Sequence, residues 1–85
     1  MNTLHKELCT TAIVIAPMET AEALQQDVFS KWDGAELLDG DAYGSGNSAF
    51  LYENTTNYES LEQFVDEVHD MIIDMGSVAE KTAIF

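Results

Sequence analysis

The chain has 85 residues, of which 46% are hydrophobic, and 16 acidic side chains face three lysines and no arginine. This length predicts one domain, residues 1–85, with a modest core, since a chain of this size buries only about 60–65% of its unfolded surface. The formal net charge of −13 repels phosphate groups, which excludes nucleic acid and anionic membranes as direct ligands and favours a basic protein partner.

The sequence predicts a cytoplasmic protein without a membrane span. The longest apolar run, Ala12 to Ala16, is followed by Pro17 and falls far short of the roughly 20 residues that cross a bilayer. The N-terminus shows no signal-peptide pattern. One cysteine, Cys9, forms no intrachain disulfide, and this fits a reducing compartment.

The first third of the chain predicts a strand followed by a helix. Residues 8–16 are rich in apolar and β-branched side chains, which is typical of a buried central strand. In residues 18–32 the apolar side chains recur every three or four positions, which predicts an amphipathic helix. Gly34 is suited to the left-handed conformation that ends such a helix.

The middle of the chain predicts a β-hairpin. Residues 35–39 and 48–53 have strand character, and Gly40, Gly44 and Gly46 between them supply turn chemistry.

A second helix is predicted over residues 57–75, with a final strand over 81–85. Thr56 and Glu59 match the Thr-x-x-Glu capping box, and Gly76 ends the helical pattern. The resulting order is β-α-β-β-α-β, which predicts an α+β fold with two helices packed on one face of a four-stranded antiparallel sheet. The split βαβ, or ferredoxin-like, arrangement has this order.

A helical wheel of the second helix separates apolar from acidic side chains. Four of the acids are spaced four residues apart, so like charges follow one another along the helix, at a cost of a few tenths of a kcal/mol for each pair. The helix has no Lys or Arg to pair with them. The predicted partner-binding residues are the acids of this helix and of the neighbouring loop, namely Glu59, Glu62, Asp66, Glu67, Asp70, Asp74, Asp39 and Asp41.

Other candidate sites are weaker. The glycine-rich segment 40–48 lacks the lysine of a Walker loop and the context of a dinucleotide-binding loop. His5, Cys9 and His69 lack the paired spacing of zinc ligands. We therefore expect no metal, no cofactor and no catalytic residue, and a small enzyme is the least favoured reading of the sequence.

In size, charge and expected architecture the chain resembles small acidic phage or mobile-element inhibitors, such as anti-CRISPR, anti-restriction and uracil-glycosylase-inhibitor proteins. This resemblance implies a DNA-mimic decoy that binds a basic nucleic-acid-binding protein, such as a nuclease or a CRISPR or restriction effector. An immunity protein or antitoxin against a basic nuclease would use the same physics. A housekeeping domain adapted to high salt is a third reading, and it predicts acids spread evenly over the surface, whereas a decoy predicts them concentrated on the second helix and the adjoining loop.

Overall fold

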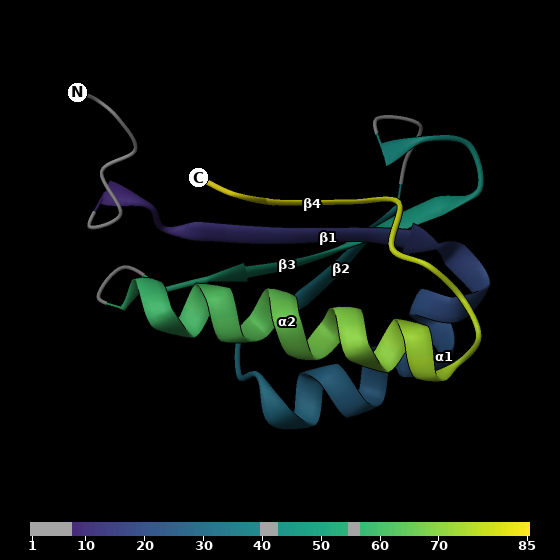
Figure 1. Cartoon of the computed structure of the whole chain (residues 1–85), viewed down its shortest axis with the longest axis horizontal. Helices are drawn as coiled ribbons and strands as arrows, with labels where there is room; N and C mark the ends of the chain where they lie inside the picture. The colour runs from purple at the N-terminus through teal and green to yellow at the C-terminus, as the bar shows by residue number, and fades with distance from the viewer. Residues whose placement is uncertain (1–7, 40–42, 55–56) are drawn as a thin grey trace.

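The computed structural model describes residues 8–39, 43–54 and 57–85, and it has the predicted α+β architecture (Figure 1). Two helices cover one face of a four-stranded antiparallel sheet. The elements in chain order are β1 (Thr11–Pro17), α1 (Met18–Lys31), β2 (Glu36–Asp39), β3 (Asn47–Glu53), α2 (Tyr58–Asp74) and β4 (Lys81–Ile84).

The strands lie in the spatial order β2-β3-β1-β4, with every neighbouring pair antiparallel. This differs from their order along the chain, because β3 lies between β1 and β2. The two short strands β2 and β4 therefore form the edges. In the centre of the sheet Val14 of β1 is opposite Phe50 of β3 on one side and Thr82 of β4 on the other.

The core lies between the sheet and the two helices. Alternate residues of β1 are fully buried, because successive side chains of a strand point to opposite faces. The apolar stripes of the helices meet this face, with α1 over β1, β2 and β3 and α2 mainly over β1. The buried residues that build this layer are Ala12, Val14, Ala16, Ala21, Leu24, Val28, Phe50, Leu61, Phe64, Val68 and Ile72.

The first strand starts later than expected. The strand begins at Thr11 rather than at residue 8, and Leu8 is 72% exposed. The strand is central but is buried on one face only, because both helices pack on the same side of the sheet. Ile13 and Ile15 point to the other side and are half-buried.

The helix ends follow from local chemistry. The side chain of Asn57 caps α2, with its Oδ1 atom accepting a hydrogen bond from the Glu59 amide at 2.9 Å. The predicted capping residue Thr56 lies outside the described residues. The two glycines expected to follow the helices, Gly34 and Gly76, have φ angles of +89° and +81°, the left-handed conformation predicted for them.

An aromatic cluster joins the end of α1 to β3 and α2. The Trp32 ring lies edge-on to Tyr52 and Phe64, with centroid distances of 5.4 and 5.5 Å, and Tyr52 stacks on Phe64 at 5.0 Å. Trp32 is 8% exposed, and its Nε1–H has no hydrogen-bond partner among the described residues. The cluster therefore gains apolar packing, and it leaves one buried N–H donor without an acceptor, which costs stability.

This balance can be tested with two substitutions of Trp32. Trp32→Ala is expected to lower the free energy of unfolding by about 3–5 kcal/mol, the usual effect of removing a large buried ring. Trp32→Phe keeps an aromatic ring and removes the unpaired donor, so its cost is expected to stay below about 2 kcal/mol. Urea unfolding followed by far-UV circular dichroism measures both. Equal losses would show that the indole N–H contributes a favourable interaction.

Candidate functional site: an acidic surface on α2

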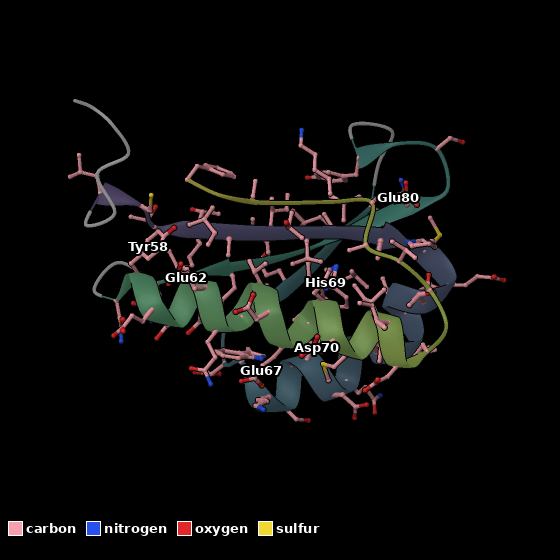
Figure 2. All side chains as sticks on the ribbon, viewed as in Figure 1. Tyr58, Glu62, Glu67, His69, Asp70 and Glu80 are labelled. Atoms are coloured by element: carbon pink, nitrogen blue, oxygen red, sulfur yellow. The ribbon has the colours of Figure 1, made fainter. Side chains whose placement is uncertain are left out.

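Five carboxylates share the solvent-facing side of α2, and we call them the acidic surface. They are all exposed, whereas the opposite side of the helix is buried in the core. Figure 2 labels two of them, Glu62 and Asp70, on this helix. The members of the acidic surface are Glu59, Glu62, Asp66, Asp70 and Asp74.

Four of these residues form a row along the helix. Glu62, Asp66, Asp70 and Asp74 are each four residues apart, so consecutive carboxylates are about 6 Å apart along the axis. A single DNA strand advances about 3.4 Å per phosphate, so the row offers roughly one carboxylate for every second phosphate. Four residues exceed one helical turn by about 40°, and the row therefore winds slowly around α2.

The acidic surface lacks internal charge compensation. None of its five carboxylates forms an ion pair with another described residue. Asp74 also lies in the last turn of α2, where no basic side chain is present and where a negative charge opposes the helix dipole. The arrangement costs stability, and a lysine or arginine at any of these positions would relieve that cost.

Glu67 belongs to a different environment. It lies on the side of α2 that faces α1, where its carboxylate forms an ion pair with Lys31 of α1. Gln63 also donates a hydrogen bond to Glu67 Oε2 at 2.7 Å. The hydrogen bond from Lys31, and after it the one from Gln63, lowers the pKa of Glu67 below its ordinary value. Glu67 thus links the two helices and is not an unpaired carboxylate like its neighbours.

Of the two predicted loop residues, Asp39 lies apart from the acidic surface. Asp39 lies at the end of β2, the edge strand beneath α1, and accepts a hydrogen bond from the buried hydroxyl of Ser48. α2 packs on the same face of the sheet but mainly over β1, which is separated from β2 by β3. Asp41 lies outside the described residues.

The acids of α1 were not among the predicted partner-binding residues. Glu19, Glu22 and Asp27 are exposed on that helix, so nine of the 14 acids within the described residues come from the two helices. The signal was present in the sequence, because these acids fall between the apolar positions of α1. The layer of helices is consequently far more acidic than the sheet.

The remaining candidate sites gain little from the structure. The described part of the glycine-rich segment is a turn in which Asn47 Nδ2 donates to the Tyr43 carbonyl at 3.0 Å. Within the described ranges no group of three His, Cys, Asp or Glu side chains is placed to hold a metal ion, and no pocket is present. Cys9 is buried, and His5 lies outside these ranges. Neither described helix combines the length and the apolar character needed to cross a membrane.

Comparison of the chain with protein-family models, with curated proteins and with solved structures found no match.

The assignment of Glu67 can be tested by titration. Lys31→Met removes the cation and is expected to raise the pKa of Glu67 towards its ordinary value, whereas Lys81→Met on β4 should leave it unchanged. Because the folded-state pKa is lowered, the ion pair stabilises the fold above the unfolded-state pKa, and this contribution disappears as the pH falls through the folded-state pKa. The pair is partly exposed, so its contribution should be below about 1 kcal/mol.

Carboxyl-carbon NMR titration of the wild type and both lysine variants measures these pKa values. An unchanged Glu67 pKa in Lys31→Met would show that the cation is not the cause.

Proposed function

We propose that this protein binds and inhibits a basic nucleic-acid-binding protein by presenting carboxylates in place of phosphates. The observation that carries the proposal is the row of four exposed, unpaired carboxylates, Glu62, Asp66, Asp70 and Asp74, along one helix. The expected partner is a nuclease or a CRISPR or restriction effector with a groove lined by Lys and Arg. The α2 helix would lie in such a groove, with its carboxylates against the Lys and Arg side chains.

The support of α2 by the core suits this role. Leu61, Phe64, Val68 and Ile72 fix the inner side of the helix against the sheet and α1, so the outer carboxylates are held on a rigid element before binding. Preorganised groups lose little conformational entropy on association. Each carboxylate can then accept a charge-assisted hydrogen bond from Lys or Arg, and the field of the protein accelerates the encounter.

The distribution of charge favours binding over adaptation to high salt. An even distribution is expected when acids serve solvation alone, yet six of the 14 acids within the described residues lie on α2, and three more lie on α1. The sheet face opposite the helices carries a largely apolar centre, which solvation by acids does not explain. An immunity protein or antitoxin against a basic nuclease would use the same surface, and the identity of the captured partner distinguishes it from an inhibitor of a CRISPR or restriction effector.

A paired set of double variants tests the proposal. Asp66→Asn with Asp70→Asn removes two charges from the middle of the row while keeping the shape of α2, and Glu19→Gln with Glu22→Gln removes two from α1. Partners are first captured from a cell lysate on the wild-type protein and eluted with rising salt. Titration calorimetry with the purified partner should then show that the α2 pair weakens binding by about 2–5 kcal/mol and the α1 pair by much less.

Three further results complete this test. The stability of the α2 double variant should hold or rise slightly, because repulsion along the helix is relieved. The wild-type protein should displace DNA from its partner and should not itself bind duplex DNA at physiological salt. Equal loss of binding by the two double variants would show that the charge acts as a diffuse field, and a partner that still binds DNA in the complex would contradict inhibition by mimicry.

A further inference from the structure

The sheet has a second face, which the helices leave uncovered. Both helices lie on one side of the sheet (Figure 1), and the alternation along each strand assigns a set of side chains to the other side. We call this set the open sheet face. Its apolar members are Ile13, Ile15, Leu38, Ala49, Leu51 and Ala83.

These residues form two adjacent rows across the strands. The register places Glu36, Leu51, Ile13 and Ala83 in one row and Leu38, Ala49, Ile15 and Lys81 in the next. The centre of both rows is apolar, with its large members half-buried and Ala49 fully buried. Contiguous apolar patches of this kind commonly mark contact sites.

The charged residues of these two rows lie at opposite edges. Glu36 is on β2, the outermost strand on one side, and Lys81 is on β4, the outermost strand on the other. A two-fold axis parallel to the strands would place the β2 edge of one sheet over the β4 edge of another. Each Glu36 would then lie near a Lys81 of the opposing copy, with the apolar residues packed between them.

We propose that the open sheet face is the interface of a homodimer in which two copies pack face to face, the β2 edge of one over the β4 edge of the other. This inference goes beyond the proposed function and does not depend on it. A two-fold arrangement uses the same patch on both copies, and the face is self-complementary in both its apolar centre and its edge charges.

The distribution of charge also favours a second copy of the chain, and not the basic partner, as the occupant of the open sheet face. The basic partner is drawn to the helices, where most described acids lie. The two apolar rows carry no carboxylate on the central strands, and Glu53 of β3 lies in the next row. In the proposed dimer the two layers of helices point outwards. With sheets about 10 Å apart and a helix layer of about 10 Å on each outer side, the acidic layers are separated by roughly 30 Å, well beyond the Debye length of about 10 Å at 0.1 M salt.

The size of the face limits the strength of the dimer. Four strands spaced about 4.8 Å apart make a contact roughly 20 Å wide, and a patch of that extent is smaller than the roughly 800 Å² per partner of a standard specific interface. The self-repulsion of two chains of charge −13 weakens it further. We therefore expect association that is visible at high micromolar concentration and that strengthens as salt is raised from 0.05 to 0.5 M.

Sedimentation velocity over a concentration series up to about 500 μM, in low and high salt, tests this proposal with two matched variants. Ile13→Glu puts a charge at the centre of the open sheet face, and Ile73→Glu makes the same change at a half-exposed position of α2. The wild type and Ile73→Glu should dimerise, whereas Ile13→Glu should raise the dissociation constant at least tenfold. Far-UV circular dichroism verifies that each variant is folded.

Charge reversal gives a second test that leaves the apolar centre intact. Glu36→Lys and Lys81→Glu should each weaken the dimer several-fold, and the double variant should restore it. A wild-type chain that stays monomeric at every concentration and salt, or a dimer broken by Ile73→Glu and not by Ile13→Glu, would overturn the proposal. Failure of the double variant to restore association would overturn the proposed placement of the edges.

Discussion

The packing of α1 and α2 against a single face of the sheet is the constraint from which both exposed surfaces follow. Val14 and Phe50 from the sheet meet Val28, Leu61 and Phe64 from the helices, all fully buried. Burial of large apolar side chains contributes roughly 1.5–3 kcal/mol each, so this layer dominates the stability of a small domain. Because the inner sides of both helices are buried in this layer, most of their acids face the solvent. The other face of the sheet has no helix packed on it.

Repulsion between carboxylates opposes the stability that the apolar core provides. A row of like charges along α2 costs a few tenths of a kcal/mol for each neighbouring pair, and the high net charge adds general self-repulsion. One carboxylate escapes this cost, because Glu67 turns towards α1 and meets Lys31. The contrast between Glu67 and the acidic surface is informative, since the chain compensates the charge that joins its helices and leaves uncompensated those that face outwards.

Patterns within one segment were predictable from the sequence, and contacts between segments were not. α2 was expected over 57–75 and spans Tyr58–Asp74, because its apolar side chains repeat with the helical period. The ion pair of Glu67 with Lys31 could not be foreseen, since the two residues are 36 positions apart in sequence and meet only through the packing of the two helices. The segment 8–16 was expected to be a buried central strand because of its apolar, β-branched residues. The structure buries only the alternate residues Ala12, Val14 and Ala16, and the same run supplies Ile13 and Ile15 to the open sheet face.

The central claim is that the negative charge of this protein acts as a localised surface on α2. Titration of the ¹⁵N-labelled protein with a short oligolysine peptide, followed by ¹H–¹⁵N correlation spectra, tests this without knowledge of the natural partner. The account predicts that the largest shift changes cluster on the outer side of α2, around Glu62, Asp66, Asp70 and Asp74, and that they decrease as salt is added. Changes of equal size at exposed acids elsewhere, such as Glu19 and Glu53, would contradict it.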